Sequence, residues 1–313
     1  MRRAFSEALI QLGRSDPRVI FLTGDLGYQV FDAFREEFPT RYLNVGVAEA
    51  QLVNCAAGLA LEGWRPLIYS IASFLTGRAF EQIRLALGYH RLPVVVVGAG
   101  GGYSYAQSGV THHAQEDLAL MSLIPGLTVT CPGGPDEISA LLPQLVRQDG
   151  PSYLRIGRFG EPPVPSSAPI TVGRGRRVRS GERVAFLTTG SVVIPVTRAA
   201  DGLAAEGRAV TVCHFHTLRP FDEALLAEVA AHAETLIVVE DHGLRGGLRD
   251  TVTRWLVTAP PHLAPNRLRM IGVGPGDTVI LGNPTPDEVM RRCGITAEAL
   301  TETGRSAWTA RPG

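Results

Sequence analysis

Short runs of apolar and β-branched residues recur along this chain of 313 residues and alternate with segments of helical periodicity. In the first half of the chain these runs begin at Val19, Arg65, Leu92, Leu127 and Pro151. Continuously apolar runs are typical of strands that are buried on both faces, as in parallel sheets covered by helices on both sides. We therefore expect an α/β fold with a doubly wound sheet.

Two such series follow one another along the chain. The first predicts a domain over residues 1–160, with helices over residues 3–12, 49–61, 78–89, 115–123 and 137–147. The segment GEPPVPSSAP, at residues 160–169, is too rich in proline for a helix, so we expect a linker over residues 161–175. The second series predicts a smaller doubly wound α/β domain over residues 176–313.

Composition excludes several classes of function. All 30 basic residues are Arg, and the absence of Lys rules out Schiff-base chemistry, pyridoxal phosphate attachment and a P-loop. The chain has no net charge and no apolar run of membrane-spanning length, so we expect no nucleic-acid and no membrane partner. The N-terminal residues do not resemble a signal peptide, and the four Cys lie far apart, which predicts a cytoplasmic protein with reduced thiols.

The segment NVGVAEAQ, at residues 44–51, places one carboxylate, Glu49, before a helix of small and apolar residues. A buried carboxylate needs a proton or hydrogen-bond donors, because burying it unpaired costs several kcal/mol. One interpretation is that Glu49 binds a ligand. The other is that it occupies the first turn of a helix, where the helix dipole favours negative charge.

Motifs along nearly the whole chain resemble, in order, the pyrimidine-binding and C-terminal domains of the transketolase family, which includes deoxyxylulose-phosphate synthase. Besides NVGVAEAQ these motifs are TGDLG (23–27), SFLTGRAFEQIR (73–84), GVTHHAQEDLALMSLIPGLTV (109–129), DGPSYLRIGR (149–158), FDEALL (221–226) and VVEDHGLRGGL (238–248). The resemblance implies thiamine diphosphate as the cofactor. It implies that Glu49 is the catalytic group on the aminopyrimidine ring and that Phe74 stacks on that ring. Gly46 and Asp25 are expected beside the cofactor.

The same resemblance implies the residues that contact the substrate. His112 is the favoured group for the substrate oxygens and His113 is the alternative, since a histidine of near-neutral pKa can donate or relay a proton. Arg158 is implied to bind an anionic group of the substrate. Ser108 and Gln29 stand where family members carry other substrate-binding residues.

Two departures from the family affect the expected substrate. A histidine and an aspartate of the family fall on Gly100 and Gly101 of the GAGGG segment at residues 98–102. We therefore expect a roomier, less polar cleft under this segment and a substrate other than an ordinary pentose or hexose phosphate.

The Gly-Asp-Gly pattern with a following Asn, by which the family holds Mg²⁺ and the diphosphate, is absent from the sequence. The chain therefore resembles the C-terminal subunit of a split, two-chain transketolase, and we expect no metal ligands on it. The resemblance implies an N-terminal partner subunit that holds the diphosphate with Mg²⁺, in an α2β2 complex.

The function predicted for that complex is transfer of a ketol or acyl unit from a ketose or 2-oxoacid donor to an aldehyde-type acceptor. Two alternatives stay open: the beta subunit of a 2-oxoacid dehydrogenase, and a non-catalytic scaffold subunit. The sequence does not identify the donor, the acceptor or the partner chain.

Overall fold

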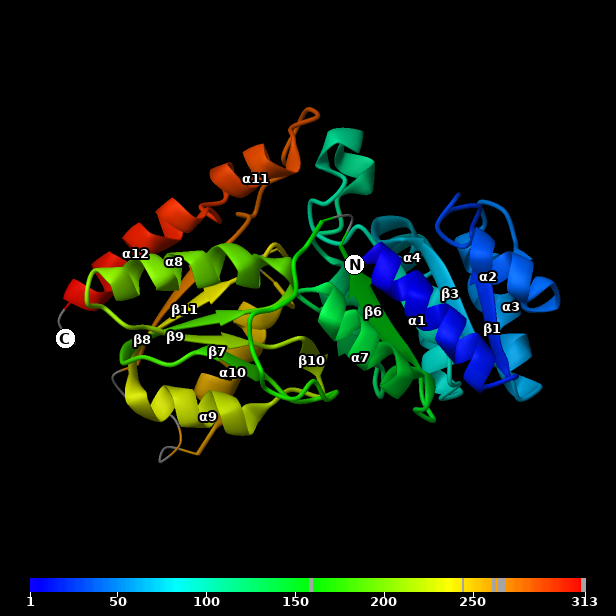
Figure 1. Cartoon of the computed structure of the whole chain (residues 1–313), viewed down its shortest axis with the longest axis horizontal. Coiled ribbons are helices and arrows are strands. Elements are labelled where there is room, and N and C mark those ends of the chain that lie inside the picture. Colours follow the sequence, from blue (N-terminus) through cyan, green and yellow to red (C-terminus); the bar gives the residue numbers. More distant parts are fainter. Residues whose placement is uncertain (158–159, 244, 261–262, 264–267, 311–313) are drawn as a thin grey trace.

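The structure is a computed structural model that describes residues 1–157, 160–243, 245–260, 263 and 268–310. It contains two sheets, each covered by helices on both faces (Figure 1). The expected fold class, two consecutive doubly wound α/β units, is confirmed.

The first sheet has the order β10-β5-β6-β4-β3-β1-β2 and is parallel except for β10, which pairs antiparallel with β5. Its strands are β1 (Val19–Thr23), β2 (Tyr42–Asn44), β3 (Arg65–Ile71), β4 (Val95–Ala99), β5 (Thr128–Thr130), β6 (Ser152–Ile156) and β10 (Thr217–Arg219). Its helices are α1 (Arg2–Ser15), α2 (Asp32–Glu37), α3 (Glu49–Leu61), α4 (Ala72–Arg78), α5 (Phe80–Gln82), α6 (Asp117–Ser122) and α7 (Pro135–Val146), with a π-helical segment at Ile83–Tyr89.

The second sheet has the order β12-β11-β8-β9-β7, with β7 antiparallel to β9. Its strands are β7 (Arg176–Arg179), β8 (Arg183–Thr188), β9 (Thr211–His214), β11 (Ala233–Val239) and β12 (Arg269–Val273). Its helices are α8 (Val193–Ala205), α9 (Glu223–His232), α10 (Leu248–Thr258), α11 (Pro286–Arg292) and α12 (Ala297–Thr309). In Figure 1, α8 and α12 cover one face of this sheet, and α9 and α10 cover the other.

The predicted helix over residues 78–89 is wrong at its start. The chain is already helical from Ala72, and this stretch consists of α4, α5 and the π-helical segment. An apolar run without alternation does not distinguish the end of a buried strand from the start of a buried helix. The run through residues 65–74 therefore reads as one strand, although β3 ends at Ile71.

Strand β10 was not predicted. It comes from the second part of the chain but completes the edge of the first sheet, and one hydrophobic core cluster contains buried residues from both parts. For this reason the proposed domain boundaries at residues 160 and 175 stay a prediction.

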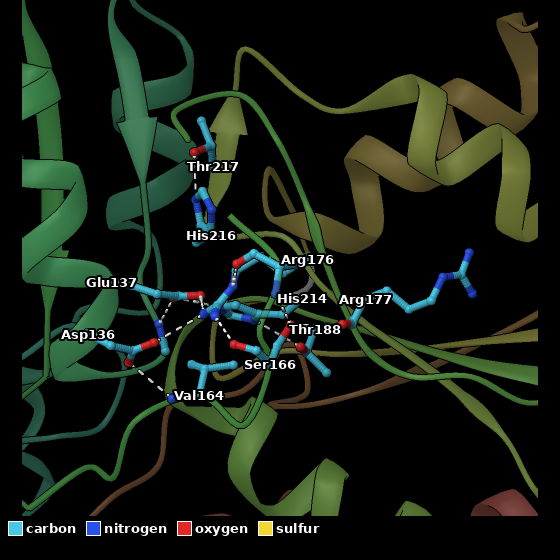
Figure 2. Close-up of polar contacts among 12 residues, drawn as sticks. Asp136, Glu137, Val164, Ser166, Arg176, Arg177, Thr188, His214, His216 and Thr217 are labelled. Carbon is cyan, nitrogen blue, oxygen red and sulfur yellow. Dashed lines mark hydrogen bonds and ion pairs between the residues drawn. The ribbon is translucent and has the colours of Figure 1, made fainter. Parts of the chain in front are cut away.

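A buried polar network joins the two parts of the chain near α7 (Figure 2). Glu137, in the first turn of α7, lies 2.7 Å from a guanidinium nitrogen of Arg176 in β7 and 3.0 Å from Nε2 of His214 in β9. Asp136 pairs with the same guanidinium at 3.2 Å. Arg176 belongs to the most basic segment of the sequence, yet it is buried here, because both carboxylates compensate its charge.

Candidate active site

The site expected around Glu49 lies at the carboxyl ends of β1, β2 and β3. The chain leaves β1 to form β2 on one side of it and then returns to form β3 on the other side. In open α/β sheets, ligands bind outside the carboxyl ends of strands at such a reversal. Glu49 begins α3, which follows β2, so its side chain stands at this reversal.

The Glu49 carboxylate is almost fully buried, with 1% of the residue exposed. Ser70, in β3, donates a hydrogen bond of 3.1 Å to Oε1. Arg78, at the end of α4, donates one of 2.6 Å from Nη1 to Oε2. Glu49 therefore occupies the first turn of a helix and is also compensated by groups of neighbouring elements, so the two sequence interpretations are compatible.

Phe74 lies beside the same guanidinium, and His112 lies beside Phe74. The guanidinium carbon of Arg78 is 5.1 Å from the centroid of the Phe74 ring, and the His112 ring meets Phe74 edge to face at 4.9 Å. Ser73 donates a hydrogen bond of 3.0 Å to the carbonyl of Thr111, which holds α4 against the segment carrying His112. Arg78 and Phe74 thus connect Glu49 to His112, and the roles that the resemblance implies for these residues stay a prediction.

The two adjacent histidines have different environments. His112 is half-buried beside Phe74, whereas His113 is buried with its ring 4.9 Å from the Tyr103 ring. Burial, and then the neighbouring His113, lower the pKa of the His112 imidazole from its usual value. His112 is therefore the accessible one of the two imidazoles, with a lowered pKa and beside Phe74.

Asp25 and Gly46 lie on the two loops that follow β1 and β2. Asn44 joins these loops, because its side-chain oxygen accepts hydrogen bonds of 3.0 Å from the backbone N–H of Asp25 and of Gly46. Hydrogen bonds from Asn44 and from Tyr28 lower the pKa of the Asp25 carboxyl. Asp25, Gly46 and the exposed Gln29 all have positive φ. The two loops therefore contain tight turns.

Two residues predicted to contact the substrate remain, Ser108 and Arg158. Ser108 is exposed in a short 3-10 turn at residues 106–108. Arg158 lies outside the described residues.

The expectation of a roomy, less polar cleft is wrong at the glycines of the GAGGG segment themselves, although a cavity of about 660 Å³ lies next to the segment, lined by Tyr103, Asp241 and Met290 among others. Cβ atoms placed at Gly100, Gly101 and Gly102 would overlap the side chains of Tyr105, Arg155 and Asp241, respectively. The cavity left beside Gly101 measures about 10 Å³, less than one water molecule needs. The family side chains missing at these positions are therefore replaced by protein, including a buried ion pair, and not by open space.

Three partners of this site were not identified from the sequence: Ser70, Arg78 and Asn44. Arg78 carries the clearest signal, because it lies four residues after Phe74, and residues at this spacing share one face of a helix. The other two are visible only when β1, β2 and β3 are aligned side by side.

Comparison with known proteins identifies the family. The family model described as "Transketolase, pyrimidine binding domain" matches residues 1–159, and "Transketolase, C-terminal domain" matches residues 173–277. The chain is 32% identical over 275 residues to the 6-deoxy-6-sulfo-D-fructose transketolase subunit SqwH of Clostridium sp. (strain MSTE9), covering 87% of this chain and 84% of the relative. The chain belongs to the transketolase family.

Other members of the transketolase family match over different shares of their length. An apulose-4-phosphate transketolase subunit of Phocaeicola vulgatus is 28% identical, with 96% of this chain and 95% of the relative covered. The 1-deoxy-D-xylulose-5-phosphate synthase of Azoarcus sp. (strain BH72) is 33% identical over 89% of this chain, which spans 44% of that enzyme. This chain is thus similar over most of its length to single subunits of transketolases.

A solved structure described as a split-gene transketolase, inactive beta4 tetramer, has a TM-score of 0.87 at 32% identity and covers 98% of both chains. The resemblance to a split transketolase subunit is therefore confirmed over nearly the whole chain. Among the residues that the structure describes, no three His, Cys, Asp or Glu side chains are grouped so that they could hold a metal ion. No helix in the described ranges is long and apolar enough to cross a membrane.

Proposed function

We propose that this chain is one subunit of a thiamine-diphosphate-dependent, transketolase-like transferase. The complex moves a ketol or acyl unit from a ketose or 2-oxoacid donor to an aldehyde-type acceptor. The partner subunit carries the diphosphate site and Mg²⁺. The observation that carries this proposal is the buried Glu49 carboxylate, which shares the Arg78 guanidinium with the Phe74 ring, and the His112 ring beside Phe74.

The site fits the aminopyrimidine end of the cofactor. The Arg78 guanidinium, a flat group with N–H donors, lies against both Glu49 and the Phe74 ring. An aminopyrimidine ring is also flat, and in its imino form the ring nitrogen opposite the exocyclic nitrogen carries an N–H, so the same two side chains would suit it. When bound, thiamine diphosphate supplies the nucleophilic carbon that attacks the carbonyl of the donor.

The residues of this chain bind and orient the cofactor and the substrate, and they move protons. Glu49 would share a proton with the ring nitrogen, donating it to the amino form and accepting a hydrogen bond from the imino form. Phe74 fixes the plane of the ring by stacking. His112, neutral at pH 7, donates a hydrogen bond to a substrate oxygen or takes its proton.

The surface next to the site supports the need for a partner. Tyr28 and Val47, on the loops after β1 and β2, expose 75% and 70% of their area, and Leu43 at the same edge exposes 41%. Exposed apolar groups that gather beside a candidate site are typical of surfaces covered by another protein. We therefore place the partner over the carboxyl ends of β1 and β2.

The donor carries an anionic terminal group in this proposal. Two relatives are named for 6-deoxy-6-sulfo-D-fructose and for apulose 4-phosphate, which are both anionic. Tyr105 and Arg155 occupy the space at Gly100 and Gly101, where family members carry other side chains, so a sugar with a different head group fits better than xylulose 5-phosphate. Efficient turnover of xylulose 5-phosphate with ribose 5-phosphate would contradict this part of the proposal.

The test is calorimetric titration of thiamine diphosphate with Mg²⁺ into this chain mixed with its candidate partner, a chain that carries Gly-Asp-Gly and the spaced Asn. We expect binding only in the mixture, and loss of donor consumption in Glu49→Gln. Glu62→Gln is the matched control, because Glu62 is exposed at the other end of α3. Equal binding by Glu49→Gln and wild type, with no ketose or 2-oxoacid consumed by either, would show that the chain is a scaffold.

A further inference from the structure

We propose that Arg78 is an internal stand-in for the cofactor ring: it occupies the place of the aminopyrimidine between Glu49 and Phe74 and is displaced when the cofactor binds. This inference rests on the proposed function, because it concerns the same site. It assigns Arg78 a role in setting the affinity for the cofactor. The residues proposed to act in catalysis do not by themselves explain that affinity.

One guanidinium makes both contacts that the cofactor ring requires. Its Nη1 donates a hydrogen bond of 2.6 Å to Oε2 of Glu49, and its carbon lies over the Phe74 ring at 5.1 Å from the centroid. These two side chains belong to different helices, α3 and α4. A flat ring hydrogen-bonded to Glu49 and stacked on Phe74 therefore overlaps with the position of the guanidinium.

The isolated chain needs such a group. A carboxylate that is 99% removed from solvent is costly unless a donor or a positive charge compensates it, and Ser70 alone supplies one neutral hydrogen bond. Arg78 supplies the charge. The buried carboxylate of Glu49 therefore has a charged partner before any cofactor is present.

Arg78 can also leave. Its side chain is 52% exposed, and within the described residues Glu49 is the one carboxylate with which it forms an ion pair. An arginine on the solvent side recovers its hydration when it swings out, so the pair is weak compared with a fully buried one. The cofactor then competes with Arg78, and its apparent affinity is reduced by the fraction of molecules in which Arg78 occupies the site.

The opposite arrangement is that Arg78 stays on Glu49 and orients it for the bound cofactor. The two arrangements predict effects of opposite sign. Removing a competitor tightens cofactor binding, whereas removing a supporting residue weakens it.

The experiment measures the Kd of thiamine diphosphate, with Mg²⁺, for the two-subunit complex containing wild type or Arg78→Ala. We expect the variant to bind about fivefold more tightly, the worth of a partly exposed ion pair. Arg84→Ala, which removes an exposed arginine from the adjoining π-helical segment, is expected to leave the Kd unchanged. An unchanged or weaker Kd in Arg78→Ala would overturn the inference.

A second measurement needs neither the partner nor turnover. In the isolated chain we expect 4-aminopyrimidine to raise the Tm of Arg78→Ala and not that of wild type, because only the variant has a vacated place between Glu49 and Phe74. An equal shift in both proteins, or none in the variant, would overturn the inference. Failure of the proposed function has a different signature: the wild-type complex would then bind no thiamine diphosphate, whatever the free ring does to the variant.

Discussion

The guanidinium of Arg155 lies 2.7 Å from the carboxylate of Asp241, and this pair joins β6 of the first sheet to the end of β11 in the second. Asp117 lies 3.0 Å from the same guanidinium. Above the pair, Gly102 and Ala114 exchange backbone hydrogen bonds of 3.0 and 2.9 Å at the two ends of the segment that carries His112. The second part of the chain therefore supports the loop on which His112 stands.

Asp241→Asn is expected to lower the free energy of unfolding by about 2 kcal/mol, because it removes a charge-assisted hydrogen bond to the buried Arg155 guanidinium, whose charge Asp117 still compensates. Urea unfolding followed by circular dichroism measures this. Asp277→Asn is the matched control, since Asp277 pairs with Arg245 on the surface at 69% and 83% exposure and should have little effect. Similar losses in both variants would contradict a special role of the Arg155 pair.

Replacing each of two glycines by alanine is expected to change the free energy of unfolding in opposite directions. A Cβ at Gly98 in β4 would overlap the hydroxyl of the buried Tyr153, so Gly98→Ala should destabilise the chain by about 2 kcal/mol. Gly58 lies exposed inside α3 with nothing within 4 Å of its Cβ position. Gly58→Ala should therefore stabilise by about 0.5 to 1 kcal/mol, through the better helix propensity of alanine. Thermal unfolding of both variants against wild type tests the pair, and a loss of stability in Gly58→Ala would speak against the packing described.

The contribution of His216, which lies beside the network shown in Figure 2, should fall on acidification. Burial raises the pKa of Glu240 to about 7, and this works in the opposite direction equally in wild type and in a His216 variant, so the comparison of the two proteins isolates His216. Burial lowers the pKa of His216 from 6.5 to about 4. Between these two values the unfolded chain takes up a proton that the folded chain refuses, so stability is lost as the pH falls from 6.5 towards 4. By this linkage the loss from pH 7 to pH 4.5 is about 2.5 kcal/mol.

His216→Gln should remove this loss, because glutamine does not titrate and can still bond to Thr217, the partner of His216 at 2.9 Å. Urea midpoints at the two pH values measure it. Burial opposes ionisation of Glu137, but the charge and hydrogen bond of His214 outweigh burial and bring the pKa of Glu137 to about 2. Its contribution is lost below pH 4.5 in both proteins and so does not disturb the comparison. If wild type and His216→Gln lost the same stability, His216 would not be the group responsible.

Substitutions of the two adjacent histidines, His112 and His113, should have different effects. In the isolated chain, His113→Ala is expected to lower the free energy of unfolding by about 2 kcal/mol, because its buried ring packs on Tyr103. His112→Ala should change stability by less than about 0.5 kcal/mol. In the two-subunit complex, His112→Ala should lower kcat by about a hundredfold with the Kd of thiamine diphosphate unchanged. A large loss of turnover in His113→Ala at full stability would reverse the assignment.

Much of the first sheet follows from local sequence, because β1, β3, β4 and β6 are buried on both faces and hence read as continuous apolar runs. Strands β7 and β10 do not follow from local sequence. The segment Arg176–Arg179 looks like a charged surface, yet alternate residues are buried there. Three residues at Thr217–Arg219 carry too little pattern to predict that they pair with β5.

The candidate site also has residues that the sequence predicts and a geometry that only the structure shows. Glu49, Phe74 and His112 were found because their motifs are local and resemble those of a known family. The choice between His112 and His113 was left open, since neighbouring residues in a motif carry equal evidence. Tyr103 decides the geometry, because its ring packs on His113 and leaves His112 beside Phe74.

By itself the sequence determined the fold class, the family resemblance and the chemical types gathered at the site, because periodicity, residue type and spacing are properties of short segments. The tertiary structure decided what compensates Glu49. Arg78 reaches it from a helix 29 positions further along the chain, and Ser70 reaches it from a strand. Such pairings depend on how α3, β3 and α4 pack against one another. Burial and charge compensation arise from that packing, and no single segment contains them.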